Sequence, residues 1–185
     1  MKIDFLDKIN EKEIKKEVIL EIAKLMAVAA RTAPKARGND NLEIAIITAQ
    51  TIKMLSETMH EIGKKYKMEF FNRDAENILN SPAILLIGTH IKTQDIKKCG
   101  MCGFKNCSEK KKYDDTPCVF NTNDLGIAIG SAVSVASNHH IDNRVMFSIG
   151  QAALKLELLG KEVKIAFGIP LSATSKNPFF DRPPV

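Results

Sequence analysis

The four cysteines of this chain lie in one stretch, residues 99–118, where their spacing could bind a metal ion or a cluster. They follow the pattern Cys99-x2-Cys102-x4-Cys107-x10-Cys118. Two thiolates three residues apart can bind one centre from adjacent corners, and two later thiolates complete a four-thiolate ligand set. This set predicts a [4Fe-4S] cluster or an all-cysteine zinc site. The spacing favours iron–sulfur, because all-cysteine zinc sites usually contain two C-x2-C pairs, and only the first pair has that form here.

The residues around the cysteines also fit a charged cluster. Gly100 and Gly103 follow the first two ligands, and glycine permits the positive φ angles that turn backbone N–H groups toward bound sulfur. Six lysines surround the ligands in the sequence: Lys97, Lys98, Lys105, Lys110, Lys111 and Lys112. They either offset the negative charge of a cluster and attract an acidic redox partner protein, or they keep an exposed loop soluble.

The composition indicates one globular domain, residues 1–185, with 44% apolar and 26% charged residues. No segment reaches the ~18 consecutive apolar residues of a membrane span, and MKIDFLDKINEKEIKKE is too charged for a secretory signal. We therefore expect a cytoplasmic protein whose cysteines are reduced and bind metal rather than form disulfides. The net charge of +5 comes mostly from scattered lysines without a nucleic-acid-binding motif, so neither a nucleic acid nor a membrane is expected as a partner.

The elements that must position the cysteines begin with a predicted amphipathic helix over residues 11–31, which ends before Pro34 because the residue preceding proline disfavours helix. Its apolar positions recur at helical spacing: Ile14, Val18, Ile22, Leu25, Met26 and Ala29. A polar turn at residues 35–41 precedes a β-branched run, which should form a strand buried on both faces. The expected elements up to the cysteines are this strand at residues 43–48, helices at 50–64 and 72–80, and a buried strand at 83–88.

The cysteines lie in a predicted insertion, residues 90–123, which is longer than most loops of compact domains. Asp124 is expected to cap the following helix, residues 124–138. In this helix the small residues Gly126, Gly130 and Ala132 would allow a partner to approach closely. No glycine-rich phosphate loop follows the strand at residues 43–48, which disfavours a dinucleotide-binding parallel sheet.

The C-terminal part should contain an extended segment, a helix that Gly160 ends, a third strand and an extended arm. The expected ranges are residues 142–149, 151–159, 163–169 and 170–185. Two neighbouring aromatic side chains, Phe179 and Phe180, predict that the arm docks on its own subunit or on a neighbour.

Several segments resemble known families. The four-cysteine segment resembles the [4Fe-4S] module of electron-transfer and corrinoid iron–sulfur proteins. The chain as a whole is similar to a group of prokaryotic ferredoxin-domain-containing proteins. The segments that carry this second resemblance are AARTAPKARGNDN (29–41), FNRDAENI (71–78), DLGIAIGSAV (124–133), IDNRVMFSIGQAA (141–153) and PLSATSKNPFFDR (170–182).

A more distant resemblance is to the FMN-dependent nitroreductases, in which the first helix leads into an alanine-rich turn that touches the flavin. Residues 30–39, followed by a strand, have that character. The resemblance implies an α+β fold: a nitroreductase-like helix/sheet sandwich, here with an inserted four-cysteine loop, and with a C-terminal arm that crosses a homodimer. The chain departs from the pattern in two ways. It lacks the basic R-S-x-R start before the first helix, and Lys35 stands where serine is usual.

The same resemblance implies FMN-binding residues on the turn and in the arm. They are Arg31, Thr32, Pro34, Lys35, Arg37, Asn39, Asn41, Lys176 and Arg182. Arg31, Lys35 and Arg37 could hold a phosphate, to which guanidinium groups bind in a bidentate manner. The alternative is a helix-ending turn with solvated charges.

These observations predict a redox protein that passes electrons between a four-cysteine [4Fe-4S] cluster and bound FMN, as a flavin-dependent oxidoreductase of nitroreductase type. The alternative is a non-catalytic iron–sulfur or zinc module with a structural, regulatory or partner-docking role. No catalytic side chain is assigned, because the flavin itself carries hydride chemistry. The cysteine segment is expected to be an attachment on which the fold does not depend.

Overall fold

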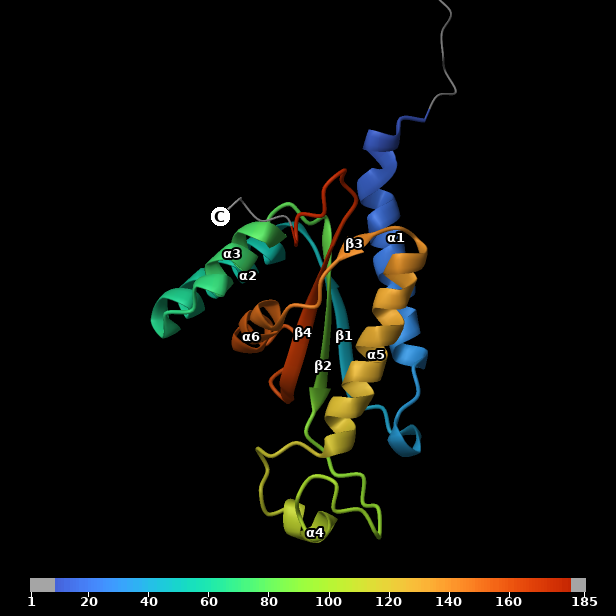
Figure 1. The fold of residues 1–185 in the computed structure, drawn as a ribbon, viewed down its shortest axis with the longest axis vertical. Coiled ribbons are helices and arrows are strands. Elements are labelled where there is room, and N and C mark those ends of the chain that lie inside the picture. Colours follow the sequence, from blue (N-terminus) through green and yellow to red (C-terminus); the bar gives the residue numbers. More distant parts are fainter. Residues whose placement is uncertain (1–8, 181–185) are drawn as a thin grey trace, which may run out of the picture.

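The computed structural model describes residues 9–180, which form a four-stranded sheet with helices on both faces (Figure 1). The strand order is β1-β2-β4-β3, and all three strand pairs are antiparallel. The strands are β1 (Leu42–Ile47), β2 (Ala83–His90), β3 (Asp142–Asn143) and β4 (Val163–Ser172). The α+β architecture predicted from the sequence is therefore confirmed.

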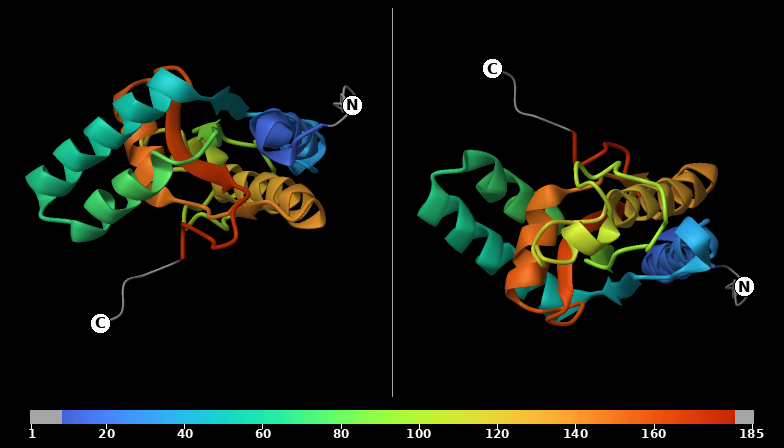
Figure 2. Two further views of the ribbon diagram at one scale, coloured as in Figure 1. Left: turned by 90° about the horizontal axis from the view of Figure 1, so that it is seen from above. Right: turned by 90° about the horizontal axis from the view of Figure 1, so that it is seen from below.

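The longer helices divide between the two faces of the sheet (Figures 1 and 2). One face packs against α1 (Glu11–Thr32) and α5 (Val119–Asn138). The other packs against α2 (Ala49–Tyr66), α3 (Glu69–Ile78) and α6 (Phe147–Lys155). Two short helices, η1 (Ala36–Gly38) and α4 (Cys107–Lys110), lie in connections. Within residues 9–180, no helix has both the length and the apolar character needed to cross a membrane.

The central position of β2 in the sheet explains why its sequence is a continuous apolar run. Successive side chains of a strand point to opposite faces, and here both faces are covered. Leu85 and Ile87 belong to the core beneath α1 and α5, whereas Ile84 and Leu86 belong to the core beneath α2, α3 and α6. All four side chains are fully buried.

The first strand, β1, differs from its prediction. It stands at one end of the strand order, Glu43 is exposed, and Ile44 and Ile46 are only partly buried. A strand at the edge of a sheet has less cover, so the β-branched run indicated a strand correctly but overstated its burial. Helix α1 is likewise less buried than its periodicity suggested: Ile22 and Met26 lie in the core, whereas Val18 and Leu25 are 44% and 49% exposed.

Helix α3 begins at Glu69 and ends at Ile78, so its predicted range of residues 72–80 was displaced toward the C-terminus. Two other predicted helix starts were wrong by a full turn or more. Helix α5 begins at Val119, with Cys118 at the N-cap, so that Asp124 lies inside the helix. Helix α6 begins at Phe147, directly after a short bridge between Met146 and Gly168. In both cases contacts with distant parts of the chain extend the helix beyond its local signals.

Two element ends were also placed incorrectly. Helix α6 ends at Lys155, and Gly160 instead has a positive φ of 88° in the turn before β4. Strand β4 continues to Ser172, because its end pairs with β3 through the partners Asp142 and Ser172. The segment predicted as an arm from residue 170 therefore leaves the sheet only after Ser172.

The segment after β4 docks on its own chain. Phe179 is 1% exposed and packs in the core with α2, α3 and α6. Arg144 also contacts this segment. Its guanidinium donates to the Phe179 carbonyl at 3.1 Å and lies 5.2 Å from the ring centre of Phe180. The rest of the predicted arm, residues 181–185, lies outside the described residues.

Candidate metal centre and the adjoining turn

The four cysteines lie in the connection between β2 and α5, residues 91–118, here called the cysteine loop; it extends beyond one end of the sheet (Figure 1). All four are free thiols. Cys107 begins α4, where its Sγ lies 3.9 Å from the Ile96 carbonyl oxygen, and Cys118 is the buried N-cap of α5. All four thiols therefore belong to one connection of the fold.

The loop has the donors of a four-thiolate centre, but in this structure they are not gathered. Within residues 9–180, no three Cys, His, Asp or Glu side chains form a group that could hold a metal ion. Gly100 and Gly103 have positive φ angles of 78° and 87°, a conformation that favours glycine. The donor chemistry thus fits a cluster or zinc, and binding requires the loop to draw the sulfur atoms together.

The lysines of the loop do not all face solvent. Lys97, Lys98, Lys105, Lys111 and Lys112 are exposed, whereas Lys110 is only 3% exposed. Lys110 lies beside a cavity of about 800 Å³ that Asp114 and Lys164 also line. Lys111 pairs with Asp95 at 2.8 Å, and its hydrogen bond holds the pKa of that carboxyl below its usual value.

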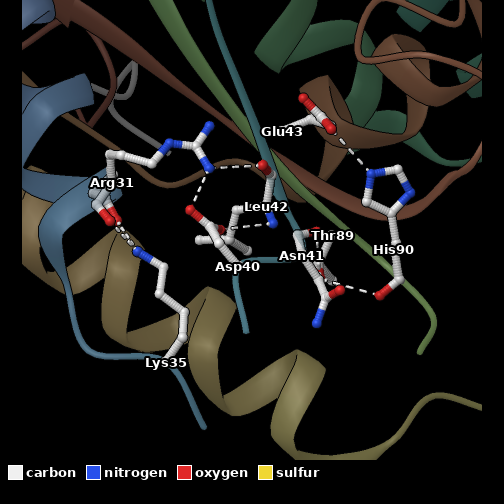
Figure 3. Close-up of polar contacts among 9 residues, drawn as sticks. Arg31, Lys35, Asp40, Asn41, Leu42, Glu43, Thr89 and His90 are labelled. Atoms are coloured by element: carbon white, nitrogen blue, oxygen red, sulfur yellow. Dashed lines mark hydrogen bonds and ion pairs between the residues drawn. The ribbon is translucent and has the colours of Figure 1, made fainter. Parts of the chain in front are cut away.

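The turn after α1 is held by its own charged side chains (Figure 3). The Arg31 guanidinium donates to Asp40 at 2.6 Å and to the Leu42 carbonyl at 2.9 Å. Lys35 donates to the backbone carbonyls of Ala30, at 2.9 Å, and Arg31. Burial acts to raise the pKa of Asp40, but the hydrogen bonds from Arg31 and the Leu42 N–H outweigh it, so the pKa is lowered. Burial, with the Arg31 charge adding to it, lowers the pKa of Lys35.

The same turn contacts the start of the cysteine loop. Arg37 has a positive φ of 58°, and its guanidinium donates to the carbonyl oxygens of Gln94 at 2.7 Å and Asp95 at 3.4 Å. The Asn39 amide donates to the Gln94 side-chain oxygen at 2.9 Å. Because 55 residues or more separate these partners, the contact fixes two distant segments against each other.

Asp124 of α5 holds the turn from the other side. Both of its carboxylate oxygens accept the Ala36 N–H at 3.1 Å, and its side chain is buried. Burial raises the pKa of Asp124 above its ordinary value, although the Ala36 hydrogen bond opposes the shift. A residue expected to cap a helix thus acts as the acceptor that anchors η1.

The predicted flavin contacts are therefore brought together only in part. Arg31, Lys35 and Arg37 share one turn, but each donates to groups of the chain, with which a phosphate would compete. The remaining turn residues make mostly local contacts: Thr32 donates to the Ala29 carbonyl, and Pro34 follows the end of α1.

The carbonyl of Asn41 accepts the His90 N–H at 3.0 Å and the Thr89 hydroxyl at 3.2 Å (Figure 3), so this residue joins the turn to β2. Of the two arm residues, Lys176 lies in the segment after β4, and Arg182 lies outside the described residues.

The sequence predicted a different role for Asp124, and it did not single out two buried amides, Gln94 and Asn121. A signal existed for two of them: once α5 is extended to Val119, Asn121 and Asp124 fall on the same helical face as the buried Ala128. Nothing local marks Gln94, whose partners come from residues 37 and 39.

The shifted pKa of Asp124 predicts a pH dependence of stability. A raised folded-state pKa means that the contribution of Asp124 is fully present below the ordinary aspartate pKa and is lost as pH rises through the folded value. Asparagine does not titrate, so the stability of the wild type relative to Asp124→Asn should fall as pH rises above the ordinary aspartate pKa. Urea unfolding at several pH values measures this difference.

Asp40→Asn is the matched control, because the Asp40 pKa is lowered rather than raised. A lowered pKa gives stability that is present above the unfolded value and lost as pH falls through the folded one. The stability of the wild type relative to Asp40→Asn should therefore rise with pH. If the stability of the wild type relative to each variant changed with pH in the same direction for both variants, this account of the turn would be contradicted.

Comparison with solved structures shows that this chain has the fold of the nitroreductases. A nitroreductase family protein from Clostridium novyi NT matches with a TM-score of 0.59 and 12% identity, over 87% of this chain and 76% of that one. The nitroreductase CinD from Lactococcus lactis, solved with nicotinic acid, gives 0.59 and 16% over 92% and 82%. A nitroreductase with bound FMN from Desulfitobacterium hafniense DCB-2 gives 0.58 and 14% over 89% and 81%. The predicted nitroreductase-like fold is confirmed.

Sequence comparison identifies a relative at higher identity. A protein of Archaeoglobus fulgidus is 42% identical over 183 residues, which cover 95% of this chain and 98% of that protein. A family model matches residues 114–182, a part that includes Cys118 but not the other three cysteines. Its description is "uncharacterized protein containing a ferredoxin domain" (DUF2148). The chain therefore belongs to this family of ferredoxin-domain-containing proteins, as its sequence motifs predicted.

Proposed function

We propose that this protein is a cytoplasmic redox protein that passes electrons between a four-cysteine [4Fe-4S] cluster and FMN bound at the turn of residues 31–41. The observation that carries the proposal is the contact between that turn and the cysteine loop, which Arg37 and Asn39 make with Gln94. Membership of a ferredoxin-domain family and the fold of FMN-binding nitroreductases support a redox role.

Different residues of the chain would bind the two cofactors. Cys99, Cys102, Cys107 and Cys118 would hold the cluster, and the turn would orient the flavin. When bound, the cluster supplies one-electron transfer and the flavin supplies one- and two-electron chemistry. The hydrogen bonds from Arg37 and Asn39 to Gln94 would hold the start of the cysteine loop against the flavin-binding turn.

Anaerobic purification tests the proposal. We expect the broad visible absorption of a cluster, with stoichiometric iron and sulfide, and quenching of FMN fluorescence on titration with the protein. Protein without iron and sulfide after reconstitution would refute the cluster. Unchanged FMN fluorescence would refute the flavin site.

One observation favours a second function. Arg31, Lys35 and Arg37 all donate to groups of the chain, which is the pattern of a structural turn rather than an open phosphate site. On this account the protein is a non-catalytic iron–sulfur or zinc module that docks a partner. It predicts stoichiometric metal without flavin, and a colourless protein if the metal is zinc.

The exposed lysines of the cysteine loop would attract an acidic redox partner. Reversing the exposed charges of Lys97 and Lys98 to glutamate should slow reduction by an acidic ferredoxin about tenfold at low salt, because such charges raise association rates. Stopped-flow rates at increasing ionic strength measure this, and the difference should shrink as salt screens the charges. Equal rates at low salt would show that the partner docks elsewhere.

We also propose a homodimer that forms through the outer face of α1. Four apolar side chains lie exposed at helical spacing on this face: Ile14, Val18, Leu25 and Val28 are 38%, 44%, 49% and 60% exposed. The double substitution Leu25→Lys and Val28→Lys should halve the mass measured by light scattering, since it places two charges in the contact. Lys53→Glu on α2 is the control and should leave the mass unchanged. A wild type that is monomeric at micromolar concentration would refute the proposal.

A further inference from the structure

Two buried amide groups at the ends of the cysteine loop lack a hydrogen-bond acceptor. Among the described residues, three buried side-chain polar atoms have no partner: Gln94 Nε2, Asn121 Nδ2 and Ser81 Oγ. Gln94 and Asn121 are 2% and 1% exposed. Burying an N–H donor without an acceptor is unfavourable, so two such donors beside one loop call for an explanation.

The oxygen atom of each amide has a hydrogen-bond donor. The Gln94 Oε1 accepts from the Asn39 amide at 2.9 Å, and the Asn121 Oδ1 accepts from the Lys92 N–H at 3.0 Å. Exchanging the nitrogen and oxygen of the Asn121 amide would place two donors against each other, because the Lys92 backbone N–H can only donate. The Gln94 amide keeps its orientation together with that of Asn39, its partner. In this arrangement both NH₂ groups lack an acceptor.

Both amides belong to segments that carry cysteines. Asn121 lies in the first turn of α5, where its backbone N–H donates to the carbonyl of the N-cap Cys118 at 2.9 Å. Gln94 precedes Ile96 by two residues, and the Ile96 carbonyl oxygen lies 3.9 Å from the Cys107 Sγ. The two amides thus lie in the segments that lead into and out of the cysteine loop, where thiolate sulfur atoms are the anionic acceptors that the loop itself supplies.

We propose that Gln94 and Asn121 donate hydrogen bonds to the sulfur atoms of the four-cysteine centre and thereby set its reduction potential. The inference rests on the metal-binding half of the proposed function. Thiolate and sulfide sulfur are anionic acceptors, and hydrogen bonds to them are charge-assisted. Such donors stabilise the more negative, reduced state, so they raise the potential of a cluster.

The test measures midpoint potentials of the reconstituted cluster by a redox titration followed by electron paramagnetic resonance. Asn121→Leu and Gln94→Met keep the approximate side-chain volume and remove the donor. Each is expected to lower the midpoint potential, and the double variant is expected to lower it further. Ser81→Ala is the matched control: Ser81 has the third unpartnered atom, but it precedes β2, whereas the cysteine loop follows that strand. Its potential should equal that of the wild type.

A second readout serves if the centre holds zinc or if one variant fails to fold. In cobalt(II)-loaded protein, loss of an N–H···S bond should move the thiolate-to-cobalt charge-transfer band to longer wavelength, and Asn121→Asp and Gln94→Glu provide further donor-to-acceptor changes. Loaded variants with wild-type potentials and bands would overturn the inference and leave the proposed function standing. A wild type that binds neither iron–sulfur nor cobalt would overturn both.

Discussion

Gly150→Ala is expected to destabilise the protein by about 3 kcal/mol or more, as overpacking against a fixed backbone does. A Cβ at Gly150 would lie 1.8 Å from the Ala166 carbonyl oxygen and 3.0 Å from the Phe167 Cα. These are backbone atoms of β4, which pairs with β2 on one side and β3 on the other, so they cannot move without disturbing the sheet. Urea unfolding followed by circular dichroism measures the loss.

Gly126→Ala provides the matched control within another helix. An added Cβ at Gly126 meets no atom within 4 Å, and the residue lies in the interior of α5. Alanine is favoured over glycine in helices, so this variant should gain about 0.5–1 kcal/mol. If Gly150→Ala were as stable as the wild type, α6 would not lie directly on β4 as described.

The parts of the fold that the sequence predicted well are those whose signals are local and repeated. The periodicity of residues 11–31 indicated α1, and the run of residues 83–88 indicated β2, because each pattern reflects burial that recurs along the element. The errors fall where a contact with a distant segment decides the boundary. Strand β4 continues to Ser172 because this residue pairs with Asp142, and nothing in the sequence near residue 170 indicates that pairing.

In the candidate site, too, the residues with local signals were predicted, and the contacts between distant segments were not. The cysteines were found from residue type and spacing, which are properties of the sequence alone. Asp124 and Ala36 are 88 residues apart, and Asn39 and Gln94 are 55 apart, so their hydrogen bonds depend on the folded topology. The turn of residues 31–41 was singled out for its cations, yet in the structure its hydrogen bonds to Gln94 and Asp124 are what link it to the cysteine loop and α5.

Cys118→Ser is expected to have opposite effects on metal binding and on the stability of the metal-free protein. Cys118 is the N-cap of α5 and makes no side-chain capping hydrogen bond there. Serine is among the preferred N-cap residues, because its hydroxyl oxygen accepts a backbone N–H of the first turn. The metal-free variant should therefore be about 0.5–1 kcal/mol more stable than the wild type. It should also lose most of its iron, because one of the four thiolate ligands is missing.

Cys118→Ala separates the two effects, since alanine removes the ligand without supplying a cap. It should lose iron as the serine variant does, but its metal-free form should gain no stability. Cys102→Ser tests the ligand alone: Cys102 lies in the loop outside any helix, so its metal-free stability should stay within about 0.5 kcal/mol of the wild type. Iron analysis and urea unfolding measure the two quantities. Full iron in Cys118→Ser would remove Cys118 from the ligand set, and unfolding of metal-free Cys102→Ser would show that the fold depends on the loop.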